Sequence, residues 1–425
     1  MPSRQALGPA GFVLRTEEVA GLPIVNRFLE RLKLSAHLSK HLSPADPRAK
    51  LAPVEALGVL VRNLVLCRVP LYSQGEWAHR LSPQLLGLSS AQVPLVNDDR
   101  IGRALDRLFD ADRTALLTDF VVHMVKEFGV ELEQFHNDST TITLHGEYAE
   151  ADGRAVRGKP TVVATQGHNK DHRPDLKQLL WILTVSADGA VPVHFKVSDG
   201  NTEDSTTHIE TWELLRRLVG KPDFLYVADC KLCTRENLRY IAKEGGGFIT
   251  ILPRSRREDT LFRDWLQKNT PQWQGLDLRV GTLAKNDEAE FVKAVESPVP
   301  DADGFRLIWV FSSSKKERDF QARKACIEKA FKDLDELGKK LEGARCRYTT
   351  RGSVAKVADT ILASSGGARW ISYELDESVK EIFRQEKRGR SGKNTRWRRT
   401  LKPCFRLRVM AIQDNIEYDV RCDGV

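Results

Sequence analysis

Two aspartates in this sequence occupy positions where a carboxylate could do chemistry. Asp138 lies within a segment rich in β-branched residues, and Asp229 directly follows the apolar run 224–228. A carboxylate inside or at the tip of a buried strand costs free energy unless it is paired or binds a metal ion, and Asp is a poor strand former. We therefore treat both residues as candidate functional groups.

The expected chemistry depends on where the two strands place these carboxylates. In open α/β sheets ligands collect at strand ends, so the two side chains converge if their strands are neighbours. Oxygen-rich sites suit Mg²⁺ or Mn²⁺, and a pair of such ions can activate an attacking oxygen and stabilise a leaving oxygen in phosphodiester chemistry. The alternative is that each aspartate caps a turn, and position alone leaves both interpretations open.

A second group of candidates lies between the two aspartates, in a polar segment that Asn169 and Pro174 mark as a loop. A loop does not hold the histidines at 168 and 172 as a helical pair of metal ligands. We interpret His136, which alternates with Asp138 on its strand, as a core histidine. The residues of the polar segment that could contact substrate phosphates are Lys170, His172, Arg173 and Lys177.

The cysteines give little support for a metal or disulfide scaffold. Cys230 and Cys233 have C-x-x-C spacing, but no second pair with zinc-ribbon spacing accompanies them, so we expect buried or helix-start thiols. The chain has seven cysteines in all, which are scattered and odd in number. This pattern argues against a disulfide framework and for a reducing cytoplasm.

Positive charge is concentrated near the C-terminus. The chain carries 66 Lys and Arg against 58 Asp and Glu, a net charge of +8, yet residues 380–408 hold twelve basic residues and only two acids. Trp397 and Phe405 lie among these charges, and Gly389 and Gly392 indicate a loop. Such a stretch suits a phosphate backbone, because each neutralised phosphate releases condensed counter-ions; a solvated surface loop is the alternative. The candidate DNA contacts are Arg388, Arg390, Lys393, Arg396, Arg398 and Arg399.

Three blocks of sequence must position these residues. In residues 1–133 apolar side chains recur every three to four positions, which predicts a helical domain. Such N-terminal domains often bind DNA or dimerise, and a packed helical domain of unknown role is the alternative. In residues 134–253 strand-like and helical patterns alternate, and residues 254–425 mix strand-like segments with a long charged helix over 315–341. The expected strands are 135–144, 179–186, 191–197, 224–228, 248–252, 280–295 and 306–311, and the expected helices of the middle block are 207–219 and 234–243.

Several of these segments resemble the DDE transposases of bacterial insertion sequences. The run Lys-Asp-His-Arg-Pro-Asp-Leu-Lys at 170–177 is its most specific part. The resemblance covers nearly the whole chain and is carried by residues 96–106, 136–140, 167–178, 199–204, 227–229 and 248–253.

The resemblance implies an α/β fold with an RNase H-like mixed sheet at 134–253, preceded by the helical domain and followed by an inserted α+β region at 254–425. In this family the first catalytic Asp lies on the first core strand and the second at the end of the fourth, which matches Asp138 and Asp229. The third acid is a Glu on a later helix. Residues 419–425 resemble the segment just before that helix, so we expect a C-terminally truncated chain whose third acid lies past Val425. Glu381 and Glu386 are the alternatives within the chain.

By this resemblance we expect a transposase that uses Mg²⁺ or Mn²⁺ to cut element ends and join them to target DNA, acting as a homodimer. Two other classes stay open, a non-catalytic DNA-binding remnant and an RNase H-like nuclease. No apolar run approaches the ~18 residues of a membrane helix. The N-terminus has no signal-peptide pattern, so we expect a cytoplasmic protein that associates with the nucleoid through DNA.

Overall fold

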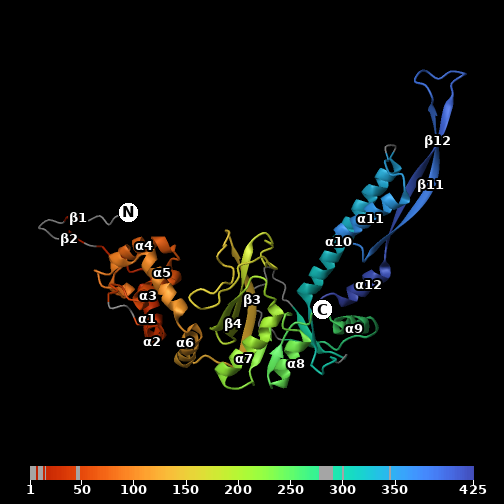
Figure 1. Cartoon of the computed structure of the whole chain (residues 1–425). Coiled ribbons are helices and arrows are strands. Elements are labelled where there is room, and N and C mark those ends of the chain that lie inside the picture. Colours follow the sequence, from red (N-terminus) through yellow and green to blue (C-terminus); the bar gives the residue numbers. More distant parts are fainter. Residues whose placement is uncertain are drawn as a thin grey trace. The chain divides into compact units, whose positions relative to one another are not determined.

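The computed structural model of the 425-residue chain is shown in Figure 1. The residues it describes are 6–7, 13–14, 16–44, 48–276, 291–298, 301–343 and 346–425. The chain divides into two compact units, Met1–Leu252 and Pro253–Val425. No helix in the described ranges has the length and apolar character needed to span a membrane.

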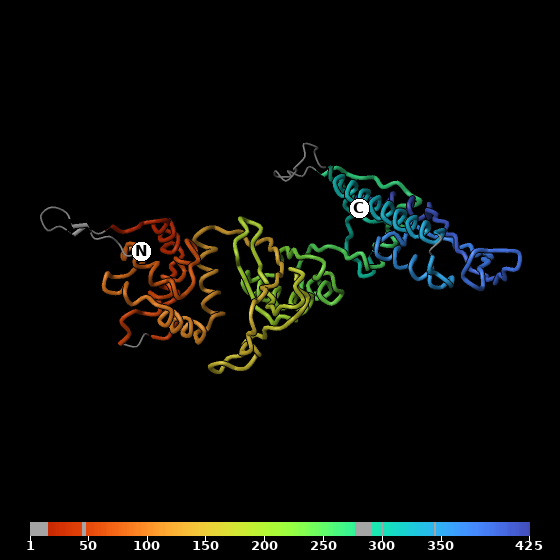
Figure 2. The backbone as a smooth tube through the Cα atoms, turned by 90° about the horizontal axis from the view of Figure 1, so that it is seen from above, coloured from red at the N-terminus to blue at the C-terminus, as the bar shows by residue number. Residues whose placement is uncertain are grey.

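The first unit starts with helices that surround one apolar core, traced in red and orange in Figure 2. Helix starts follow the sequence signals: Pro53 stands in the first turn of its helix, and the Asn97 side chain accepts the Arg100 amide at 2.9 Å. Leu22, Val59 and Ile101 are fully buried in this core. The helices are α1 (Leu22–Arg31), α2 (Leu34–His41), α3 (Pro53–Leu66), α4 (Gln74–Arg80), α5 (Asp98–Asp110) and α6 (Arg113–Phe128), and a short pair β1 (Ala6–Leu7) and β2 (Val13–Leu14) precedes them.

A five-stranded mixed sheet with the order β5-β4-β3-β6-β7 completes the first unit. Its elements are β3 (Gln134–Leu144), β4 (Lys177–Ser186), β5 (Pro192–Ser198), α7 (His208–Val219), β6 (Leu225–Ala228), α8 (Arg235–Lys243) and β7 (Gly247–Ile249). The pairs β3–β4 and β4–β5 are antiparallel, whereas β3–β6 and β6–β7 are parallel. Three antiparallel strands followed by two parallel strands across helical connections are an RNase H-like core, as the resemblance implied.

The expected strands and helices of this core form at the predicted places. The strand expected at 248–252 is the one that differs most, because β7 ends at Ile249. Beyond that point the Thr250 hydroxyl donates to the carbonyl of Asp229 at 2.6 Å. This side-chain bond holds the chain to the end of β6 where a longer strand would have used backbone bonds.

The second unit combines a small sheet with a helix-supported ribbon. The long charged helix expected at 315–341 is confirmed as α10, and of the strand expected at 280–295 only the end lies within the described residues, where β9 forms. Leu334 on α10, Val354 on α11, and Ile371 and Phe405 on the ribbon are buried in one cluster. The elements are α9 (Arg257–Lys268), β8 (Gln274–Gly275), β9 (Val292–Glu296), β10 (Ile308–Ser312), α10 (Ser313–Glu342), α11 (Arg351–Ser365), β11 (Ile371–Gln385), β12 (Trp397–Ala411) and α12 (Gln413–Cys422).

Two glycines allow a close backbone crossing beside the sheet of the first unit. A Cβ at Gly200 would lie 2.1 Å from the carbonyl oxygen of Gln178 and 2.5 Å from that of Thr165, and a Cβ at Gly167 would lie 2.3 Å from the Gly200 oxygen. The buried Gln178 side chain donates to that same Gly200 oxygen at 2.7 Å. The crossing therefore fixes both ends of the segment that contains Lys170.

Gly200→Ala should destabilise the protein by about 1–3 kcal/mol or more, because the new methyl group meets backbone atoms that cannot move independently. Gly102→Ala is the matched control: a Cβ there meets nothing within 4 Å, and Gly102 lies inside α5. Alanine in a helix should raise stability by about 0.5–1 kcal/mol. Urea unfolding curves of the two variants measure both effects. Equal midpoints for Gly200→Ala and the wild type would contradict the crossing.

Candidate active site and nucleic-acid surface

The parallel pairing of β3 with β6 brings the two candidate aspartates to adjacent positions. Asn137 is opposite Ala228, the last pair of this ladder, so Asp138 and Asp229 are the next residue on each strand. Neighbouring strands lie ~4.8 Å apart, and opposed residues of a ladder share one face of the sheet. Asp138 and Asp229 therefore occupy adjacent positions on neighbouring strands, which is the arrangement that convergence of their carboxylates requires.

The expectation that these carboxylates are buried is wrong. Strand β3 alternates, so that Phe135 and Asn137 face the core while His136 and Asp138 are exposed. The Asp138 side chain is 80% exposed, and Asp229 is exposed as well. His136 is therefore not a core histidine. Because the carboxylates lie on the solvent side of the sheet, they need no buried partner to be tolerated.

The turn-cap alternative is realised in part. The Asp229 Oδ1 atom accepts the amide of Lys231 at 2.9 Å, and the Asp138 Oδ1 atom accepts the amide of Ser139 at 2.8 Å. Both bonds are local and use one carboxylate oxygen. They orient the side chains, and they do not exclude a ligand at the exposed edge of the sheet.

The loop that follows Gly167 places a cation beside Asp138. The buried side chain of Asn169 donates to the Thr143 hydroxyl at 3.0 Å, and the Lys170 amide donates to the Thr141 hydroxyl at 3.2 Å. Lys170 Nζ donates to the Ser139 carbonyl and lies 3.8 Å from Asp138 Oδ1. Of the four residues predicted to contact phosphate, Lys170 is the one that lies beside Asp138.

The other three residues of that loop have different surroundings. Arg173 forms a bidentate pair with Asp175 at 2.8 and 2.7 Å, which lowers the pKa of the Asp175 carboxyl to about 2. Lys177 Nζ donates to the carbonyl of Glu147 at 2.6 Å. His172 is exposed and has a left-handed backbone with φ of 58°. Arg173 and Lys177 thus stabilise the loop itself.

Sequence reasoning missed a supporting network next to the two aspartates. The Ser139 hydroxyl donates to Asp204 Oδ2 at 2.6 Å. His208, 3% exposed, has its Nδ1 atom 3.1 Å from the hydroxyl of Tyr226. Burial lowers the pKa of His208, while the charges of Asp229 and Asp204 act in the opposite direction. The sequence held one indication of this network, since residues 199–204 belong to the family resemblance and end in Asp204. The resemblance assigns this segment no role.

Asp204 does not complete a metal cluster in this structure. Among the described residues, no group of three or more His, Cys, Asp or Glu side chains could hold a metal ion. Cys230 and Cys233 follow Asp229 just before α8, and Cys233 is buried. This agrees with the expectation of helix-start thiols.

The basic stretch near the C-terminus forms a long two-stranded ribbon. β11 and β12 pair from Ile371 opposite Ala411 to Gln385 opposite Trp397. The predicted loop is therefore only the tip, because most of the basic residues lie on strands. Of the candidate contacts, the tip carries Arg388, Arg390, Lys393 and Arg396, and β12 carries Arg398 and Arg399.

The register gives the ribbon one basic face. Lys380 is directly opposite Lys402, and Arg384 is directly opposite Arg398, on the same face. Like charges directly opposite each other on an antiparallel pair are destabilising. A partner with negative charge would relieve this repulsion.

The opposite face of the ribbon is apolar and exposed. It carries Val379, Phe383, Leu401 and Trp397, each more than half exposed. Arg399 lies on this face and pairs with Glu381. Glu381 and Glu386, the in-chain alternatives for a third acid, thus both belong to the ribbon and its tip.

Comparisons with known proteins match only parts of the chain. The family described as a domain of unknown function (DUF4277) matches residues 14–122. No curated protein matches. A piggyBac transposase synaptic complex with hairpin DNA is similar at 10% identity and a TM-score of 0.31, over 69% of this chain and 59% of that chain. A Mos1 transposase paired-end complex with the left transposon end is similar at 10% identity and a TM-score of 0.18, over 57% and 70%. The fold assignment rests on the strand order given above.

The buried His208 should make stability depend on pH. Its pKa is lowered from the ordinary 6.5, so its contribution is fully present above about pH 6.5 and is lost as the pH falls below that value. In thermal melts between about pH 7.5 and about pH 5, the melting temperature of His208→Asn should fall less steeply than that of the wild type. His172→Asn, at an exposed position, should keep the wild-type slope. Equal slopes for all three proteins would refute this assignment.

Proposed function

We propose that this protein is a transposase of a bacterial insertion sequence, in which Asp138 and Asp229 serve phosphoryl transfer on DNA. The observation that carries the proposal is the β3–β6 register, which makes the exposed Asp138 and Asp229 the next residues on two neighbouring strands where their ladder ends. The sequence resemblance names the same two residues. We further propose that the chain acts as a homodimer, because two element ends must be handled together.

The donor set fits a hard divalent cation. Mg²⁺ keeps several waters and is held by one or two carboxylates together with substrate phosphates, so two exposed aspartates are sufficient protein ligands for one ion. When bound at these oxygens, Mg²⁺ or Mn²⁺ would supply Lewis-acid activation of the attacking oxygen and stabilisation of the leaving oxygen. The third acid expected from the resemblance stays a prediction.

The chain's own residues bind and orient the DNA at this edge. Lys170 Nζ, held on the Ser139 carbonyl beside Asp138, provides a positive charge for a phosphate that approaches the carboxylates. Asp204 fixes the Ser139 side chain through its 2.6 Å hydrogen bond. Contacts with Lys170 and with Asp204 thereby hold the segment from Asp138 to Thr141 in place.

The ribbon is the proposed contact with the DNA backbone. Its opposed like charges become favourable when phosphates lie between or across them. Phe383 and Trp397 on the other face offer exposed rings on which unpaired bases can stack. Together the two faces fit DNA near an end or a nick.

A non-catalytic DNA-binding protein is the second candidate. It is favoured by one observation, that the described residues bring no third carboxylate into a metal cluster with the two aspartates. It predicts DNA binding through the same ribbon without any Mg²⁺-dependent cleavage. An RNase H-like nuclease, the third class considered, predicts cleavage without strand joining.

Asp138→Asn and Asp229→Asn should each abolish Mg²⁺-dependent nicking of DNA that carries the element ends and leave DNA binding nearly intact. Their Mn²⁺ affinity, followed by electron paramagnetic resonance, should fall by at least the ~10–100-fold that loss of an outer-shell partner costs. Asp223→Asn is the control, since this exposed carboxylate precedes β6 at its other end and pairs with Lys221. Unchanged Mn²⁺ binding in the two variants would remove the metal site, and an equal loss of DNA binding would indicate a structural role.

Replacing Arg396, Arg398 and Arg399 with Gln should weaken binding to DNA of any sequence. The slope of log affinity against log salt should become shallower by roughly one unit for each lost phosphate contact. Arg306→Gln, an exposed arginine of the same unit that pairs with Glu296, should leave the slope unchanged. Fluorescence anisotropy of a labelled duplex at several salt concentrations measures both. If the triple variant keeps the wild-type slope, the ribbon is not part of the interface.

A further inference from the structure

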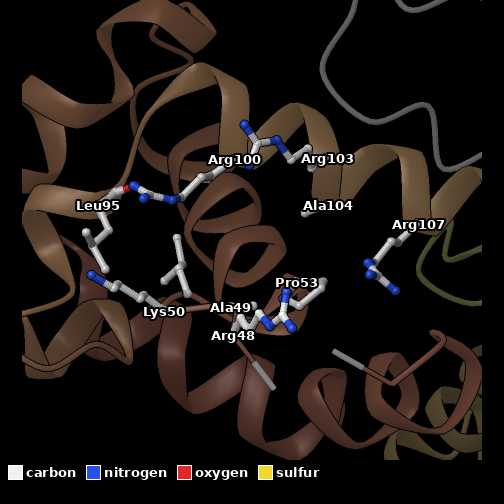
Figure 3. Close-up of a pocket in the computed structure, with 10 residues that line it drawn as sticks. Arg48, Ala49, Lys50, Pro53, Leu95, Arg100, Arg103, Ala104 and Arg107 are labelled. Carbon is white, nitrogen blue, oxygen red and sulfur yellow. The ribbon is translucent and has the colours of Figure 1, made fainter. Parts of the chain in front are cut away.

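The helical part of the first unit contains a basic cavity of about 470 Å³, shown in Figure 3. Its sides come from residues 48–53, which lead into the start of α3, from Leu95 and from α5. Among the residues that the structure describes, ten line this cavity, and none of them is Asp or Glu. Five are cationic: Arg48, Lys50, Arg100, Arg103 and Arg107. We call this feature the α5 cleft.

Helical geometry explains how the arginines come together. Arg100, Arg103 and Arg107 are spaced by three and four residues, so they form one stripe along α5. Ile101 and Ala104 on the same helix are buried. At 1.5 Å rise per residue the stripe spans roughly 10 Å, which is enough for more than one phosphate of a DNA strand with its 3.4 Å rise per nucleotide.

Hydrogen bonds to backbone carbonyls hold two arginines of the α5 cleft in place. Arg100 Nη1 donates to the Leu95 carbonyl at 2.7 Å, and Arg107 Nη1 donates to the Pro44 carbonyl at 3.2 Å. Asp110, at the end of α5, is occupied by a bidentate pair with Arg157. The cleft therefore concentrates positive charge on a fixed frame.

We propose that the α5 cleft binds the sugar–phosphate backbone of DNA. Converging cations repel one another, and this repulsion is relieved when an anion with several charges lies between them. Guanidinium groups match phosphate oxygens with paired N–H donors, which favours phosphate over a point-like anion site. This inference rests on the proposed function in DNA transposition, and it gives the helical domain a DNA contact separate from the sheet edge and the ribbon.

The test uses the full chain and binding alone, so that it does not depend on catalysis. In anisotropy titrations of a labelled duplex, Arg103→Gln/Arg107→Gln should reduce the salt slope by about two units, at ~0.9 per lost phosphate contact, and Arg103→Gln alone by about one. Arg103 is exposed, so the single variant should fold as the wild type does. The matched control is Arg27→Gln, an exposed arginine of α1 that does not line the cleft.

Each outcome decides between the proposals. An unchanged slope in both cleft variants overturns the α5 cleft, and it leaves the transposase proposal standing if the ribbon variant still lowers the slope. An equal effect of Arg27→Gln overturns the cleft as well, because the loss would then reflect net charge. Displacement of the duplex by equimolar pyrophosphate would assign the cleft to a small anion. A wild-type chain that binds no DNA overturns both the cleft and the proposed function.

Discussion

The parallel pairing of β3 with β6 is the constraint on which the candidate active site depends. The pairing sets Asn137 opposite Ala228 and so makes Asp138 and Asp229 neighbours at the point where the ladder ends. Because side chains alternate across a strand, a slip of β3 by one residue would turn Asp138 into the core and bring Asn137 to the surface. The buried side of the sheet opposes that slip: Phe135 and Phe224 pack edge to face with ring centres 5.2 Å apart, and Asn137 accepts a hydrogen bond from Thr184 at 2.8 Å.

The backbone crossing at Gly167 and Gly200 connects that register to the substrate side of the sheet. It ties Gln178 on β4 to the two segments that carry Lys170 and Asp204. Both segments then reach Ser139, one through Lys170 Nζ and one through the Asp204 carboxylate. Because of this crossing, the position of β4 relative to β3 determines where Lys170 and Asp204 lie next to Asp138. This gives a physical reason for Gly167, Asn169 and Gln178, which flank the run at 170–177.

Much of the core could be predicted from sequence because its signals are local. The β-branched run around Asp138, the apolar run before Asp229 and the Asp-Gly turn at 188–189 each indicate a strand or hairpin without reference to the rest of the chain. The exposure of Asp138 could not be predicted in this way, because β-branched residues indicate a strand without showing which of its faces is buried. The support from Asp204 was not recovered either, because it depends on a contact between residues 139 and 204 that no local pattern carries.

The same reasoning explains why the basic ribbon could be predicted from the sequence and the α5 cleft could not. The composition reveals the ribbon, since its charged residues lie close together along the chain. Its strands are not evident, because both faces of its outer half are exposed and buried and exposed residues do not alternate there. Buried residues return only at Ile371, Leu375 and Phe405, where α10 and α11 cover the described part of the ribbon. The α5 cleft is hidden for the opposite reason. Its arginines are spaced along a helix and matched with Arg48 and Lys50 from another segment, so the charge becomes concentrated only when the helical domain folds. A basic surface made by folding, unlike a basic tail, keeps its cations at fixed separations and can therefore favour a particular path of the DNA backbone.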